Sequence, residues 1–126
     1  MRFTYLLDGD ARQLRDLRAE LAIWADPATG VIDDLLIVTN ELAANALTYG
    51  SPPIKVSLQA NQDSIRIQVT QGCPMTGTLP QLASPGGERG RGLLLVSALS
   101  KAWGWSFNGR QLVVWAVLAL PGNLSQ

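Results

Sequence analysis

One abrupt change of hydrophobic periodicity, at Gly50, limits what this chain can fold into. Before it, apolar residues recur at helical spacing, at Ile32, Leu35, Leu36, Leu42 and Ala46. This spacing predicts an amphipathic helix over residues 31–49, because Gly50 is a good helix stop and the following Ser-Pro-Pro prevents continuation. Apolar and polar residues then alternate over 54–58 and 65–69, and NQDS between these runs predicts a β-hairpin. A long amphipathic helix is therefore followed directly by β-strands.

The rest of the chain supplies further elements on both sides of this unit. We expect a strand over 2–7, a helix over 11–24 with Asp10 as a possible cap, a helix over 93–101, and strands over 103–107 and 112–120. Asn108-Gly109 is the preferred two-residue hairpin turn. The last strand is nearly all apolar, which favours burial on both faces. This order predicts an α+β fold, a two-layer α/β sandwich with helices on one face of a mixed, mostly antiparallel sheet.

Composition excludes several kinds of chemistry. The 126 residues suggest one domain, spanning 1–126. The absence of histidine excludes histidine bases, histidine metal ligands and phosphohistidine relays, and the single cysteine, Cys73, leaves no internal disulfide and no cysteine zinc site. Ten acidic residues balance ten basic ones, so a nucleic-acid duplex is not a favoured partner.

No targeting or membrane segment is expected either. The first residues, MRFTYLLDGD, lack the long apolar run of a signal peptide. The longest apolar run, 112–120, is too short to span a bilayer. We therefore expect a soluble, cytoplasmic domain that does not bind membranes.

Glu41 and Asn45 are the first candidates for chemistry. They are four residues apart, so they share one face of the expected helix, beside the core-facing Leu42 and Ala46. An amide oxygen is a hard ligand suited to Mg²⁺ that also holds phosphate oxygens, and a glutamate one turn away can orient or deprotonate a nucleophile. The alternative is an ordinary solvated polar face.

The glycine-rich segment GGERGRG, at 86–92, is the second candidate. It ends a glycine- and proline-rich loop over 71–91, and a loop of that length is usually functional or mobile. It is not a Walker loop, because no lysine follows the glycines, nor a Rossmann fingerprint, because Leu95 replaces the third glycine. It still leads into a helix N-terminus, which favours anions, and Arg89 or Arg91 can bind phosphate. A flexible linker with solvated arginines fits these residues as well.

Three motifs in this order resemble the GHKL, or Bergerat-fold, ATP-binding domains, and among them the bacterial anti-sigma-factor serine/threonine kinases. ELAANALTYG, at 41–50, is similar to the family's E-L-x-x-N-A-x-x-H/Y-G box. IRIQV leading into QGCP resembles its adenine-site box, and GGERGRGLLLVSALS resembles its second glycine box. The resemblance runs from about Phe3 to Leu120.

The resemblance implies a role for each candidate residue. Asn45 would bind Mg²⁺ and through it the triphosphate of ATP, and Glu41 would be the general base or would orient water. Gln71 and Gly72 would lie at the adenine. The phosphates would be lined by Gly90, Arg91, Gly92 and Leu93. The loop over 71–91 would contain a short ATP lid, at 75–89.

The chain departs from the family pattern at Gln71, where the family has an adenine-reading aspartate. Glutamine keeps one acceptor oxygen and adds donors, but it has no charge and is one methylene longer. Glutamine can pair with adenine edges, as it does in DNA. A misplaced amide would leave polar groups unpaired, at a cost of about 1–3 kcal/mol.

Three functions fit these residues. The first is an ATP- and Mg²⁺-binding regulator of the anti-sigma type, which phosphorylates a serine or threonine of an anti-anti-sigma partner and controls a sigma factor by partner exchange. The alternative is a degenerate, non-catalytic member that has lost ATP and acts only by binding proteins. The third is a structural module whose glycine loop is a linker.

The expected partners are proteins, with a possible homodimer. The resemblance places such contacts on the outer region of the sheet and on the first strand and helix. Trp103, Trp105 and Trp115 fit either the core or an interface, and their apolar bulk favours the core.

Overall fold

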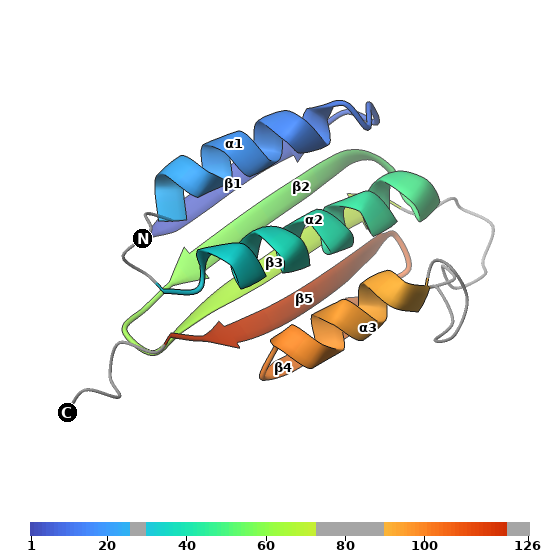
Figure 1. Cartoon of the computed structure of the whole chain (residues 1–126). Coiled ribbons are helices and arrows are strands. Elements are labelled where there is room, and N and C mark those ends of the chain that lie inside the picture. The colour runs from blue at the N-terminus through green and yellow to red at the C-terminus, as the bar shows by residue number, and fades with distance from the viewer. Residues whose placement is uncertain (26–29, 73–89, 121–126) are drawn as a thin grey trace.

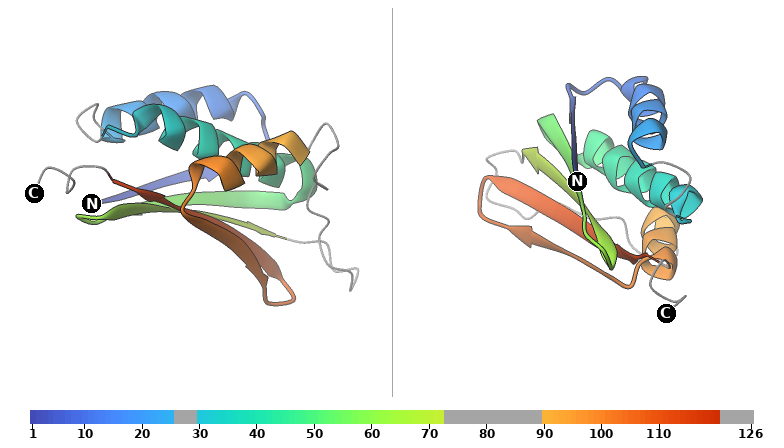
Figure 2. Two further views of the ribbon diagram at one scale, coloured as in Figure 1. Left: turned by 60° about the horizontal axis from the view of Figure 1, so that its bottom comes forward. Right: turned by 90° about the vertical axis from the view of Figure 1, so that its left-hand side faces the viewer.

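The computed structural model describes residues 1–25, 30–72 and 90–120. The elements are β1 (Arg2–Leu7), α1 (Gln13–Ala25), α2 (Ile32–Tyr49), β2 (Ser51–Ala60), β3 (Ser64–Gly72), α3 (Gly90–Leu99), β4 (Ala102–Phe107) and β5 (Gln111–Ala119). The strands form one sheet in the order β1-β2-β3-β5-β4, and each neighbouring pair is antiparallel. The helices lie on one face of this sheet (Figures 1 and 2). The predicted two-layer α+β fold is confirmed, with an antiparallel rather than a mixed sheet.

The core lies between the helices and the inner face of the sheet. Helix α2 contributes Leu35, Val38 and Leu42, which are buried among the inward residues of the strands. Those residues alternate as the sequence predicts, at Ile54, Val56 and Leu58 in β2, at Ile65, Ile67 and Val69 in β3, and at Leu112, Val114, Ala116 and Leu118 in β5. Helix α2 therefore rests on the central strands and fixes the position of its polar face.

Several expected ends of elements are wrong. Helix α3 spans Gly90–Leu99 rather than 93–101, so its first turn is formed by the last three residues of the glycine-rich segment at 86–92. Strand β2 begins at Ser51 rather than at residue 54, and its pairing with β3 shifts register before Lys55. Proline has no N–H for a strand ladder, so the two prolines fit where the ladder is interrupted.

The expected burial of β5 on both faces is also wrong. Val113, Trp115 and Val117 point away from the helices and are only half-buried, since no described element covers that face. The guanidinium of Arg66 lies over the Trp115 ring, 4.7 Å from its centroid. A Cβ on Gly104 would lie 2.8 Å from Cζ2 of Trp115, so the indole lies flat across β4.

The tryptophans therefore do not share one environment. Trp103 is half-buried and packs against the core, as expected. Trp105 is 46% exposed, and Trp115 lies on the outer face. The expectation of a core position is therefore wrong for these two residues.

The last hairpin turns one residue later than predicted. The N–H of Asn108 donates to the carbonyl of Gln111 at 3.2 Å, which leaves Gly109 and Arg110 as the central residues. The Asn108 side-chain oxygen accepts from the N–H groups of Arg110 (2.9 Å) and Gln111 (2.8 Å). Gly109 has a φ of 92°, which glycine adopts without strain. The glycine therefore takes the first central position of the turn.

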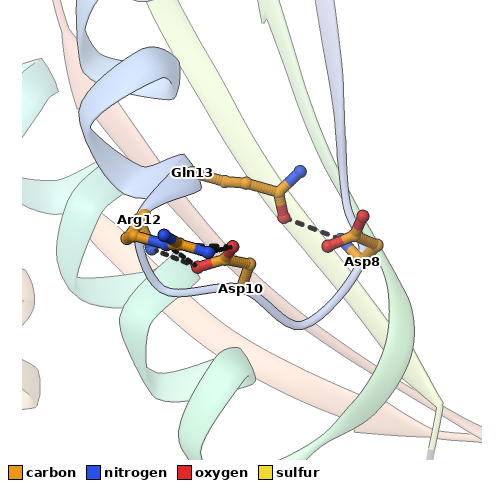
Figure 3. Close-up of polar contacts among 4 residues, drawn as sticks. All are labelled: Asp8, Asp10, Arg12 and Gln13. Carbon is orange, nitrogen blue, oxygen red and sulfur yellow. Dashed lines mark hydrogen bonds and ion pairs between the residues drawn. The ribbon is translucent and has the colours of Figure 1, made fainter.

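A polar corner joins β1 to α1 (Figure 3). The Asp10 carboxylate accepts hydrogen bonds from the backbone N–H of Arg12 (2.9 Å) and from its guanidinium (2.9 and 3.2 Å). The Gln13 side-chain oxygen accepts from the N–H of Asp8 at 2.9 Å. Asp10 thus stabilises the turn before α1, which begins two residues later than expected. None of the described helices is long and apolar enough to cross a membrane.

Candidate functional site

Three candidate motifs converge at one end of the molecule. The C-terminal half of α2, the last residues of β3 and the first turn of α3 lie at this end (Figure 1). Contacts between Glu41 and Gly92 and between Gly50 and Gln71 join them in pairs. The expected lid at 75–89 lies outside the described residues.

Glu41 and Asn45 lie on the same side of α2, one turn apart. Both are half-buried, whereas their neighbours Leu42 and Ala46 are buried in the core. The buried pair fixes the rotation of the helix about its axis. The two polar side chains are therefore held at the border between core and solvent.

The carboxylate of Glu41 lies directly against the start of α3. A Cβ built on Gly92 would lie 2.5 Å from Oε2 of Glu41, closer than real Cβ contacts allow. The first N–H groups of a helix lack partners within the helix and carry partial positive charge, so a negative group is favoured there. Glycine at position 92 is what lets the carboxylate and the helix start approach each other.

The remaining residues of the expected phosphate loop lie in the same helix. Gly90 and Arg91 form its first turn with Gly92, and Leu93 is 7% exposed and turned toward the core. A buried leucine at this position fixes how the first turn faces α2. The backbone of this turn, rather than a free loop, is thus available to an anion.

Gln71 occupies an inward position at the end of the central strand β3. It follows the buried Ile65, Ile67 and Val69 in alternation and is itself only 2% exposed. Its Nε2 is fully buried and has no hydrogen-bond acceptor within the described parts of the chain. A Cβ on Gly50 would lie 2.6 Å from this nitrogen, so the amide packs against the backbone at the end of α2.

Gly72, the other residue expected at the adenine, ends β3 beside β2. It pairs with Ser51, and a Cβ there would lie 3.1 Å from the Ser51 carbonyl oxygen. The close approach of two backbones explains a small residue at this place. Gly72 therefore lets the backbones of β2 and β3 approach each other next to Gln71.

These residues fit a nucleotide with a divalent cation. Buried polar groups are normally paired, so the lone Nε2 of Gln71 suits a ligand that brings an acceptor. No group of three His, Cys, Asp or Glu side chains that could hold a metal ion occurs among the described residues. Mg²⁺ is commonly held by one or two protein oxygens together with substrate phosphates. Asn45 would supply such an oxygen.

Two features near this site were not predicted from the sequence. Gly50 was identified as a helix stop and as the last residue of the ELAANALTYG motif, but its contact with Gln71 was not predicted. A hollow of about 430 Å³ on α1 is lined by Ala11, Arg12, Leu14, Arg15 and Arg18. Arg18 donates to the side-chain oxygen of Asn40 at 2.7 Å, next to Glu41 in the chain. The spacing of these arginines, three residues apart in and just before α1, is the signal that would have revealed them.

Comparisons with known proteins agree with this fold. Residues 7–118 match a protein family described as the histidine kinase-like ATPase domain. The Acinetobacter baumannii histidine kinase AdeS has a similar fold, with a TM-score of 0.54 and 14% sequence identity over 94% of this chain and 68% of that chain. A search of curated proteins finds no match.

Proposed function

The chain belongs to the family of histidine kinase-like ATPase domains, and from this premise we propose that its site binds ATP with Mg²⁺ and transfers the terminal phosphoryl group to a protein hydroxyl. The observation that carries the proposal is the contact between Glu41 and Gly92. It brings a carboxylate to the helix start where phosphates would bind, and both groups are negative. Mg²⁺ would offset their repulsion, and Asn45, one turn from Glu41, would hold it.

Each residue has one task in this proposal. The backbone of Gly90, Arg91 and Gly92 binds the phosphates, and Gln71 binds the base. Asn45 would hold the cation, which would neutralise the charge that develops on the phosphates. Glu41 accepts the proton of the attacking serine or threonine hydroxyl. The hydroxyl oxygen bonds to the terminal phosphorus of ATP, the bond from that phosphorus to ADP breaks, and ADP leaves. Positioning and charge stabilisation account for most of such catalysis.

We further propose that the phosphorylated partner is an anti-anti-sigma protein and that a sigma factor is the second partner. Side chains on α1 support this proposal. Ile23 is 82% exposed, and the arginine-lined hollow lies at the start of the same helix. Arginines are enriched in protein interfaces, and their cores are apolar.

Isothermal titration calorimetry tests the nucleotide site directly. The purified chain is titrated with ATP in Mg²⁺ and then in EDTA. We expect saturable heat with Mg²⁺ and a loss of affinity of at least tenfold without it. Incubation with labelled ATP and an anti-anti-sigma protein from the same organism then tests transfer to serine or threonine.

The rival function is a protein-binding module that has lost its nucleotide. The neutral amide of Gln71, in the place where the resemblance expects a carboxylate, favours it. In that case millimolar ATP with Mg²⁺ gives no heat, while binding to a sigma factor or an anti-anti-sigma protein persists without nucleotide.

A further inference from the structure

Gln71 presents an amide nitrogen that no other described group pairs with. The side chain is 2% exposed, points to the helix side of the sheet, and has a fully buried Nε2 without an acceptor. A buried donor without an acceptor is costly in free energy, so its place is best explained by a ligand that supplies one. Such a ligand must carry atoms that match an amide at this place.

The amide has a hydrogen-bonding pattern that a carboxylate lacks. It carries one acceptor oxygen and a donor nitrogen side by side, whereas an ionised carboxylate carries acceptors only. The 6-amino edge of adenine offers a donor beside a ring acceptor. The 6-oxo edge of hypoxanthine or guanine offers an acceptor beside a ring N–H donor. An amide pairs with either edge when its plane turns by half a revolution.

Gly50 leaves room for the amide in both orientations. A Cβ on Gly50 would lie 2.6 Å from both Cδ and Nε2 of Gln71, so the flat group lies against a backbone that has no side chain. The oxygen and nitrogen ends of an amide are nearly equal in size, so turning it changes hydrogen bonding and leaves packing unchanged.

We propose that Gln71 makes this a purine site of relaxed base selectivity, which accepts a 6-oxopurine nucleoside triphosphate as well as ATP. The inference rests on the proposed nucleotide site. A carboxylate oxygen facing the 6-position would accept from the amino group of adenine but would repel a 6-oxo oxygen, and so would disfavour that base. The glutamine removes this repulsion and offers a donor instead.

The test compares ATP with inosine triphosphate (ITP), whose base differs from adenine only in the 6-oxo group and the ring N–H. Calorimetry in Mg²⁺ on the full chain is expected to give Kd values within about threefold of each other. In Gln71→Glu, which keeps the shape and replaces the donor by an acceptor, ITP is expected to weaken relative to ATP by at least about tenfold. Gln68→Glu makes the same change on the outer face of β3 and should leave the ratio unchanged.

The outcomes distinguish the failure of this inference from the failure of the proposed function. ATP binding with ITP weaker by more than tenfold in the natural chain overturns the inference and leaves the proposed function standing. Binding of neither nucleotide overturns the proposed function and the inference with it. The ratio in the natural chain decides even where Gln71→Glu fails to fold. An unchanged ratio in a folded Gln71→Glu variant overturns the role of the amide.

Discussion

Gly92 of α3 lies against the carboxylate of Glu41 of α2, with no room for a side chain between them. The same place on the molecule combines the start of a helix, which attracts anions, and a negative side chain. A structural carboxylate there would serve as a helix cap. A catalytic one would have to stay at this position while phosphate and cation bind beside it. The two roles differ in what happens when the carboxylate is displaced.

Gly92→Ala should displace the carboxylate at little cost in stability. The new Cβ would meet Oε2, the far end of a flexible side chain that can turn away, and alanine favours helix over glycine by about 0.5–1 kcal/mol. We expect a melting temperature close to that of the natural chain, with phosphoryl transfer reduced at least tenfold. Thermal unfolding and a transfer assay measure the two.

A double-mutant cycle tells whether Gly92 acts through Glu41. Glu41→Ala with Gly92→Ala should be no less active than Glu41→Ala alone, because the residue displaced by the alanine is already absent. Ser97→Ala, on the exposed face of α3, is the control and should change neither quantity. A large further loss in the double variant would contradict the proposed role.

Gly50→Ala should behave differently, because one of its contacts is rigid. The new Cβ would lie 2.6 Å from the Gln71 amide and 2.8 Å from the carbonyl oxygen of Ala46, a backbone atom that cannot turn away. We expect a loss of unfolding free energy on the order of 1–3 kcal/mol, measured by urea denaturation. In a Gln71→Ala background the loss should shrink but persist. A Gly50→Ala variant with an unchanged free energy of unfolding would show that the packing between the end of α2 and Gln71 is looser than the contacts indicate.

Asn45→Ala should abolish the effect of Mg²⁺ on ATP binding while the fold remains intact. Asn45 is half-buried, whereas its neighbours Ala43 and Ala46 are in the core, so its replacement by alanine leaves the core packing of α2 in place. We expect at least a tenfold loss of affinity in Mg²⁺ and little change in EDTA, by calorimetry. Asn40→Ala is the matched control, because it removes an asparagine on the same helix that contacts Arg18 instead. Equal losses in both variants would contradict the assignment.

The long helix and the inward side of the sheet were predictable because their patterns have one physical cause. Leu35, Leu42 and Ala46 recur at the helical period because they face one core, and the alternation through Ile65 and Ile67 has the same origin. Continuing that alternation places Gln71 inward as well. The sequence therefore contained the information that this polar residue is buried.

Other features were not predictable because no pattern encodes them. The first turn of α3 has glycines, which carry no side chain and so add nothing to an apolar period; the pattern began only at Leu93. The sequence of an apolar strand is the same whether or not other elements cover its second face. The expected core position of Trp115 was wrong for this reason. The contacts of Gly50 and Gly92 join segments far apart in the chain, so only tertiary packing reveals them.

The corner between β1 and α1 should contribute to stability in a pH-dependent way. Hydrogen bonds from the Arg12 side chain, and then from its backbone N–H, lower the pKa of Asp10. A carboxyl whose pKa is lower in the folded state stabilises it above the unfolded value, and this contribution is lost as pH falls through the folded value. The melting temperatures of the natural chain and Asp10→Asn should therefore differ at neutral pH and converge below about pH 4.

The two kinds of bond at this corner can be separated by salt. Asp10 and Arg12 are at the surface, so their ionic attraction is screened and the difference at neutral pH should be small and smaller still in 1 M salt. Arg12→Gln removes the guanidinium but keeps the backbone N–H that donates to Asp10 at 2.9 Å. In an Arg12→Gln background, the melting-temperature difference caused by Asp10→Asn should therefore no longer depend on salt but should keep part of its pH dependence. A difference between the natural chain and Asp10→Asn that stays constant from pH 7 to pH 3 would show that the ionised carboxylate does not stabilise this corner.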